Sequence, residues 1–221
     1  MKAIIFDMDG LMFDTESLWV SSAINACKQM EYKITEKLPT LCIGTNKETT
    51  KNIFQKHLGN TFDFETFYLI SRDIMKEEIK KEGLKTKKGL LELLSYLKDK
   101  NYLLAIASSS TKKVINDYLK LTNIDKNNFY KIVSGEDFKE SKPNPDIFIK
   151  TCELLNVKPN EAIVLEDSNN GITAAYKAGC KTILIPDIDI LKDQTIKMAT
   201  YQVQSLLEVI DILENNIESN K

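Results

Sequence analysis

Residues 2–17, KAIIFDMDGLMFDTES, join a short apolar run to a set of acidic residues. The run Ala3–Phe6 has the composition of a buried β-strand, and it is followed by Asp7 and Asp9, with one methionine between them. Two carboxylates about 4 Å apart repel each other by about 4 kcal/mol at an effective dielectric constant of about 20. The stretch therefore predicts a strand end at which a cation neutralises acids.

Further apolar runs and helix-period segments alternate along the rest of the chain. The predicted strands after the first are Leu103–Ala107, Lys131–Ser134, Ala162–Leu165 and Thr182–Ile185. The predicted helices among and after them are Leu90–Lys98, Lys112–Leu121, Asp146–Leu155, Ile172–Ala178 and Ser205–Ile217. Continuous apolar strands interleaved with helices are typical of a sheet covered on both faces. We therefore predict an α/β fold with a doubly wound, mostly parallel sheet.

The interval between the first two predicted strands is far longer than a crossover needs. Its helix-like patterns are Leu18–Met30, Glu48–Leu58 and Phe64–Lys81, with no convincing strand among them. We interpret residues 17–82 as an inserted helical subdomain, and residues 1–16 plus 83–221 as the core into which it is inserted.

The composition narrows the class of protein. The chain has 221 residues, 43% of them hydrophobic, and a formal net charge of −2. These values suit a full apolar core and give no sign of a nucleic-acid or acidic-membrane partner. There is no run of about 18 apolar residues, and no charged leader with an apolar core and cleavage site. We expect a cytoplasmic protein that does not span a membrane, and a monomer suits this size.

The cysteines and the histidine restrict the chemistry. Cys27, Cys42, Cys152 and Cys180 are far apart in sequence and include no C-x-x-C pair, so we expect reduced core residues. His57 is the one histidine. A zinc site with two imidazoles is therefore excluded, and a histidine base is disfavoured. The remaining candidates are carboxylates, hydroxyls and lysines.

Polar side chains follow four of the predicted strands, where ligands bind in open α/β sheets. In strand order these are Asp7 and Asp9, Ser108 and Ser109, Lys142, and Glu166 and Asp167. Each of these residues, taken alone, could instead have a purely structural role in a turn, as a helix cap or as a loop lysine. An EF-hand is excluded, because its spacing places Met12 and Leu18 where Gly and Glu are required.

Taken together, the strand-end residues predict phosphoryl transfer. Carboxylates suit Mg²⁺, while a lysine and a hydroxyl beside a helix N-terminus suit a phosphoryl group. One carboxylate would attack phosphorus to form an aspartyl phosphate, and a second acid would handle the protons.

The stretches FDMDGLMFDTE, IASSS, SKPNPDIF and LEDSNNGI resemble, in this order, the haloacid dehalogenase superfamily of phosphotransferases. The helical insertion resembles the small α-helical cap of its β-phosphoglucomutase-like branch. The resemblance implies that Asp7 is the nucleophile and Asp9 the general acid/base. It also implies a Mg²⁺ site formed by Asp7, the Asp9 carbonyl and Asp167, with Glu166 as a further ligand or an acid behind the ligands.

The same resemblance implies that Ser108 and Lys142 bind the phosphoryl group, with Ser109 assisting.

The candidate substrate contacts are Glu16, which directly precedes the insertion, and Trp19, Lys47 and Arg72 within it. β-Phosphoglucomutase has a histidine at the position of Trp19 and an arginine at that of Lys47. Tryptophan cannot transfer protons as a histidine does, and lysine cannot form the bidentate hydrogen bonds of an arginine guanidinium.

The sequence thus favours a Mg²⁺-dependent phosphatase of a small phosphorylated metabolite, with a sugar phosphate as the expected class. A β-phosphoglucomutase-type mutase is the alternative. A phosphorylated signalling receiver fits less well, because receivers are about half this length and take their acids from different strands.

Overall fold

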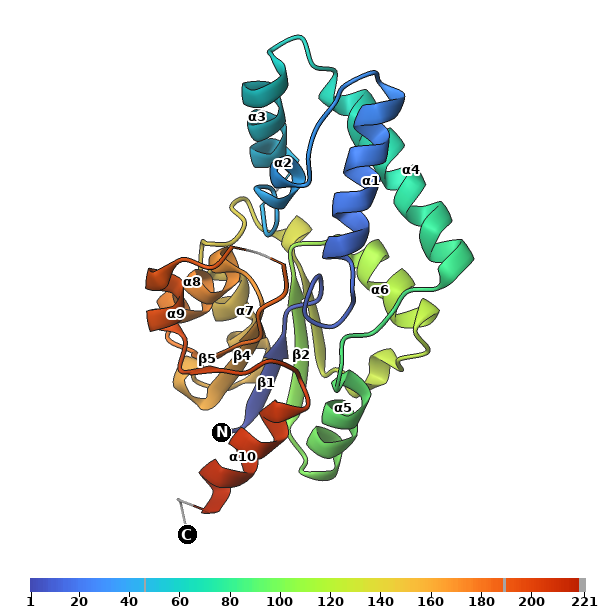
Figure 1. Ribbon diagram of the computed structural model, residues 1–221. Helices are drawn as coiled ribbons and strands as arrows, with labels where there is room; N and C mark the ends of the chain where they lie inside the picture. The colour runs from blue at the N-terminus through green and yellow to red at the C-terminus, as the bar shows by residue number, and fades with distance from the viewer. Residues whose placement is uncertain (46, 189, 219–221) are drawn as a thin grey trace.

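A six-stranded parallel sheet forms the centre of the molecule (Figure 1), in a computed structural model that describes residues 1–45, 47–188 and 190–218. The strands are β1 (Ala3–Phe6), β2 (Leu103–Ser108), β3 (Lys131–Ser134), β4 (Ala162–Glu166), β5 (Lys181–Leu184) and β6 (Tyr201–Gln202). Their order is β3-β2-β1-β4-β5-β6, and every pairing is parallel. The order reverses beside β1, which is the switch point where ligands bind in doubly wound sheets.

Alternate residues of β1 enter two different apolar cores. Ile4 and Phe6 join one cluster with side chains of α5 (Leu90–Asp99), α6 (Lys112–Leu121) and α10 (Glu208–Glu218). Ala3 and Ile5 join a second cluster with α7 (Asp146–Leu155) and α8 (Asn169–Ala178). These helices cover opposite faces of the sheet (Figure 1), and α9 (Asp193–Met198) packs against α8. The continuous apolar character of the strands follows from this double burial.

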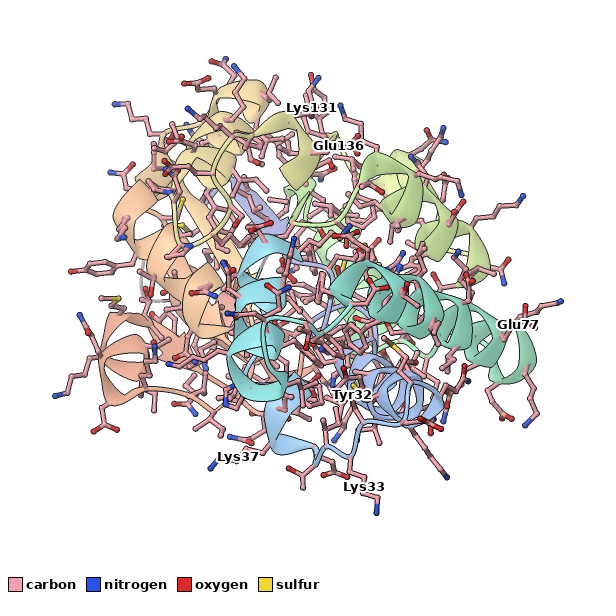
Figure 2. All side chains as sticks on the ribbon, turned by 90° about the horizontal axis from the view of Figure 1, so that it is seen from above. Tyr32, Lys33, Lys37, Glu77, Lys131 and Glu136 are labelled. Carbon is pink, nitrogen blue, oxygen red and sulfur yellow. The ribbon has the colours of Figure 1, made fainter. Side chains whose placement is uncertain are left out.

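Four helices, which we call the helical unit, lie beyond the carboxyl ends of the strands (Figure 1). They are α1 (Glu16–Gln29), α2 (Lys37–Thr40), α3 (Lys47–Leu58) and α4 (Phe64–Glu82). The unit has an apolar cluster of its own, in which Phe54, Phe62 and Phe67 are in mutual ring contact. Seen from above, α1, α3 and α4 lie in front of the sheet, with Lys33 and Glu77 extending outward (Figure 2).

The chain leaves the sheet and returns to it through two paired linkers. Asp14 N donates to Lys85 O at 3.0 Å, and Lys87 N donates to Met12 O at 2.9 Å. Phe13 forms an antiparallel bridge with Thr86 between these two bonds. The helical unit is therefore attached at one place, beside the end of β1.

The predicted α/β fold is confirmed, and the differences concern short elements and helix ends. The sequence analysis missed α2, α9 and β6, which have at most six residues each and are too short to show a period. Helix α8 begins at Asn169 rather than at Ile172, because the Ser168 hydroxyl caps it by accepting from Gly171 N at 3.0 Å. The last helix begins at Glu208 rather than at Ser205.

All four cysteines are buried and carry free thiols, as expected for core residues. The sulfur atoms of Cys152 and Cys180 lie 3.8 Å apart between α7 and the start of β5. Among the described residues, no helix combines the length and apolar character needed to cross a membrane.

Candidate active site

Lys142 and Asp7 form a buried ion pair at the end of β1. The Lys142 ammonium donates to Asp7 Oδ1 at 2.5 Å, to Glu166 Oε1 at 2.8 Å and to the Ala107 carbonyl at 3.2 Å. These three bonds use all three ammonium protons. Although burial opposes the charged form, the two carboxylates raise the pKa of Lys142 above its ordinary value. The lysine therefore stays charged at the strand ends.

Glu166, the last residue of β4, is bonded through both carboxylate oxygens. Its Oε1 accepts from Lys142, while its Oε2 accepts from the Asp167 and Ser168 amides, both at 2.9 Å, and from the Ser168 hydroxyl at 3.0 Å. A Cβ added at Gly171 would overlap this carboxylate, so the glycine leaves room for it. With every oxygen committed to the protein, the geometry favours Glu166 as an acid that holds Lys142 rather than as a metal ligand.

Asp9 is held between two hydroxyl groups. Thr15 Oγ1 donates to its Oδ1 at 3.0 Å, and Ser110 Oγ donates to its Oδ2 at 2.7 Å. Gly10, at φ +80°, turns the chain here and donates its amide to Thr15 Oγ1 at 3.2 Å. The turn and the two hydroxyls orient the Asp9 carboxylate, which lines the cavity described below.

Asp167 has an unsatisfied oxygen. The residue is 1% exposed, and within the described residues nothing hydrogen-bonds its buried Oδ2. Burial, followed by the negative charges of Glu166 and Asp7, raises the pKa of Asp167 well above its ordinary value. A buried carboxylate oxygen without a donor is costly unless a proton or a cation joins it.

Burial also raises the pKa of Asp7, to about 7, against the opposing charge of Lys142. Asp7 and Glu166 thus pair with the ammonium of Lys142, and two further buried acids, Asp167 and Glu16, line one small cavity with them. When these acids are ionised, their negative charge exceeds the one positive charge of Lys142, and a divalent cation would offset part of the excess.

Two cavities at the switch point are lined by these acids. The smaller, of about 40 Å³, is lined by Asp7, Asp9, Glu16, Gly44, Ser109, Lys142, Glu166, Asp167 and Ser168. The larger, of about 630 Å³, is lined by Asp9, Glu16 and Ser109 together with residues of the helical unit. The structure therefore brings the predicted strand-end residues together at one place.

Ser108 and Ser109 differ in their placement. The Ser108 side chain is fully buried at the end of β2, and its Oγ accepts from Ser110 N at 3.0 Å. Of the two, Ser109 lines both cavities within the described part of the chain.

The predicted contacts from the insertion all line the larger cavity. Glu16 begins α1 and reaches both cavities. Trp19 donates its indole N–H to Pro39 O at 3.3 Å. Lys47 forms an exposed ion pair with Glu65 at 2.7 Å and lies 4.6 Å from the centre of the Tyr68 ring.

The sequence analysis assigned no role to Thr15, Ser110 or Tyr118, which are among the residues that line the larger cavity. Thr15 and Ser110 directly follow acid-bearing or strand-end segments, so their hydroxyls were a usable signal. Tyr118 lies on α6, where the sequence shows only an amphipathic helix. Arg72, the fourth predicted substrate contact, lies on α4 and lines the same cavity.

The donor set fits a hard cation. Across the described residues, no three His, Cys, Asp or Glu side chains are arranged as a ready-made metal cluster. A cation here would take side-chain oxygens from Asp7 and Asp167, and its remaining ligands from the Asp9 carbonyl, water or substrate. Such all-oxygen sets with few protein ligands suit Mg²⁺. The unsatisfied Asp167 oxygen is consistent with this fit.

The fold and the cavities define the class of protein: a doubly wound α/β protein with an acid-lined ligand cavity at the switch point of its sheet. The family model described as haloacid dehalogenase-like hydrolase matches residues 4–185. The chain therefore belongs to the haloacid dehalogenase-like hydrolase family, and it is an enzyme of that family's phosphatase type.

Individual relatives agree with this assignment. The chain is 32% identical over 183 residues to the phosphorylated carbohydrates phosphatase of Thermotoga maritima, covering 83% of this chain and 84% of that protein. It is 26% identical over 212 residues to hexitol phosphatase B of Escherichia coli (strain K12), and the match covers 94% of this chain and 93% of that protein. The β-phosphoglucomutase of Clostridium difficile has the same fold, with a TM-score of 0.80 at 21% identity over 100% of this chain and 98% of that one.

Proposed function

We propose that this protein is a Mg²⁺-dependent phosphatase that hydrolyses a small phosphorylated carbohydrate through an aspartyl phosphate on Asp7. The observation that carries the proposal is the excess of negative charge at the strand ends, where buried acids outnumber the one ammonium that pairs with Asp7 and Glu166. The names of two relatives, a phosphorylated carbohydrates phosphatase and a hexitol phosphatase, support the substrate class.

The proposed reaction has two steps. In the first, an oxygen of Asp7 attacks phosphorus, the bond to the sugar oxygen breaks, and Asp9 gives that oxygen a proton. In the second, Asp9 takes a proton from water, which attacks phosphorus and releases inorganic phosphate, so Asp7 is regenerated. Lys142, by exchanging one of its present partners for the phosphoryl group, and the Ser108–Ser109 segment would hold the phosphoryl oxygens. Mg²⁺, when bound by Asp7, Asp167 and the Asp9 carbonyl, would supply charge stabilisation for the phosphoryl group.

The division of the chain is part of the proposal. Residues 1–16 and 83–221 would act as the catalytic core, and residues 17–82 as a cap that supplies substrate contacts. The supporting observation is the larger cavity, to which both parts contribute.

A phosphosugar mutase remains the second candidate, because the chain shares the β-phosphoglucomutase fold. A mutase must exclude water from its phosphorylated intermediate and hold a second phosphate. The indole N–H of Trp19 is committed to Pro39 and exchanges no proton, and Lys47 is paired with Glu65. Both features favour hydrolysis.

The test is a phosphate-release panel of hexose phosphates, hexitol phosphates, nucleotides and phosphoglycolate, with Mg²⁺ or with EDTA. We expect Mg²⁺-dependent release from carbohydrate phosphates. Release that is equal in EDTA, or restricted to non-carbohydrate substrates, would contradict the proposal. β-Glucose 1-phosphate with a trace of its bisphosphate separates the candidates, since glucose 6-phosphate without free phosphate would indicate a mutase.

A further inference from the structure

Two buried thiols are in contact in the core, between α7 and the start of β5. The sulfur atoms of Cys152 and Cys180 are 3.8 Å apart, although the two residues are 28 positions apart in sequence. Cys152 is 1% exposed and Cys180 is 8% exposed, and both carry free thiols. Neither thiol takes part in the hydrolysis proposed above, so the pair is free for another chemistry.

The separation of the two sulfurs is close to what a disulfide bond requires. Such a bond is about 2.05 Å long, so the sulfurs have to approach each other by about 1.8 Å. This movement is shared between two side chains, each of which can rotate about its Cα–Cβ bond. The apolar cluster around the pair includes small side chains of α8, Ala174, Ala175 and Ala178, which restrict such rotations less than branched side chains would.

The contact makes the two thiols chemically unequal. With Cys180 as the donor, the hydrogen bond between them lowers the pKa of Cys152 below its ordinary value. The same bond, together with burial, raises the pKa of Cys180. Because the thiolate is the form that attacks an oxidant, Cys152 is the nucleophile of the pair and Cys180 the thiol that reacts second. Cys180 lies between two exposed residues, Gly179 and Lys181, so the pair is close to solvent.

The pair also joins two helices that lead away from the candidate active site. Helix α7 follows the loop that carries Lys142, and α8 follows Glu166 and Asp167. The two helices pack against each other over one face of the sheet (Figure 1). Cys152 lies in the last turn of α7, and Cys180 directly follows the residue that ends α8. A covalent bond between the sulfurs would therefore tie the ends of both helices together.

We propose that Cys152 and Cys180 are a redox-active pair that hydrogen peroxide converts to a disulfide and that thiol reductants restore, and that this disulfide stabilises the fold by holding α7 to the end of α8. The Cys152 thiolate attacks one peroxide oxygen, the O–O bond breaks, and a sulfenic acid forms with release of hydroxide. The Cys180 sulfur then attacks the Cys152 sulfur, the S–O bond breaks, and a second hydroxide leaves. The two thiol protons convert both hydroxides to water, so one peroxide is reduced as two thiols are oxidised.

The chemical step is tested by peptide mass spectrometry of the intact chain before and after treatment with hydrogen peroxide. Remaining thiols are blocked with N-ethylmaleimide in urea, and the protein is digested without reduction. We expect a cross-linked pair of peptides that contain Cys152 and Cys180, lighter by two hydrogens than the reduced peptides, and its loss after dithiothreitol. Sulfinic or sulfonic acid at Cys152 without the cross-link, or a disulfide that involves Cys27 or Cys42, would overturn the proposal.

The structural effect is tested by melting curves. A disulfide across 28 positions restricts the unfolded chain, so the oxidised protein should melt about 5 °C or more above the reduced protein, and dithiothreitol should reverse the shift. Cys180→Ser should lose the cross-link and the shift. Cys27→Ala is the matched control, because Cys27 is also fully buried but belongs to the cluster of the helical unit, and it should keep both.

A melting temperature that is unchanged or lower in the oxidised wild-type protein, or a shift of the same size in Cys180→Ser, would overturn the stabilising role. If Cys180→Ser does not fold, the wild-type curves before and after dithiothreitol still decide the question. None of these measurements uses a phosphorylated substrate, so their outcome is independent of the proposed hydrolysis.

Discussion

The Lys142 ammonium lies 2.5 Å from Asp7 Oδ1 and 2.8 Å from Glu166 Oε1, so one lysine joins the ends of two neighbouring strands. Phe6 pairs in register with Leu165, and the residues that follow each of them bring their carboxylates to the same ammonium. The ion pairs are almost fully buried, which makes their electrostatic energies large and their separation costly.

Lys142→Met should destabilise the protein strongly. The variant leaves Asp7 and Glu166 buried without a counter-ion, and breaking such a pair costs about 3–5 kcal/mol. Urea denaturation at pH 7 measures the change in the free energy of unfolding. The matched control is Lys113→Met, which removes an ion pair whose lysine is 84% exposed, and should cost less than about 1 kcal/mol. Equal losses in the two variants would contradict the account of the buried pair.

The variants Asp167→Asn and Glu166→Gln should differ in their Mg²⁺ requirement, because Asp167 is expected to bind the metal directly and Glu166 only to support the residues around it. We expect Asp167→Asn to raise the Mg²⁺ concentration for half-maximal activity by about a hundredfold or more, and Glu166→Gln by about tenfold, since outer partners of metal sites matter less than the ligands. Magnesium titration of phosphate release measures both values. A larger shift in Glu166→Gln would assign the ligand role to Glu166.

Removal of a neighbouring hydroxyl that donates a hydrogen bond to Asp9 should slow turnover without disrupting the fold. Ser110→Ala and Thr15→Val each delete one hydrogen bond that orients the Asp9 carboxylate, and each should lower kcat by about tenfold. Ser17→Ala serves as the control, because Ser17 is exposed and its hydroxyl donates to Asp14, at 2.6 Å, rather than to Asp9. If kcat in Ser110→Ala and Thr15→Val equals that of the control, the hydroxyls do not orient the acid.

The metal-free protein should lose stability as the pH rises from about 4 to about 7. Folded Asp7 keeps its proton up to about pH 7, whereas the ordinary value is 3.8, so in this window the folded state binds more protons than the unfolded state. A bound cation replaces that proton. Melting curves in EDTA and in Mg²⁺ should therefore show a larger stabilisation by Mg²⁺ at pH 7.5 than at pH 5, and an equal effect at both pH values would count against a site on Asp7.

The sheet was predictable because double burial leaves a plain signature: strands such as Ala162–Glu166 are apolar up to their last residue. The strand ends were predictable for a related reason, since parallel strands direct their following residues to one edge. The hydrogen-bond partners of those residues were not predictable. Both carboxylate oxygens of Glu166 are occupied by Lys142 and the following loop, and this depends on side-chain directions that the sequence does not specify.

The most direct test of the account is to trap the phosphorylated intermediate. The protein is mixed with Mg²⁺ and a carbohydrate phosphate that it hydrolyses, quenched within milliseconds, and treated with borohydride, which reduces an aspartyl phosphate to homoserine. Peptide mass spectrometry then locates the modified residue, with Asp7→Asn as the unreactive control. The account predicts homoserine at position 7; homoserine at Asp9 or Asp167, or steady phosphate release by Asp7→Asn at the wild-type rate, would contradict it.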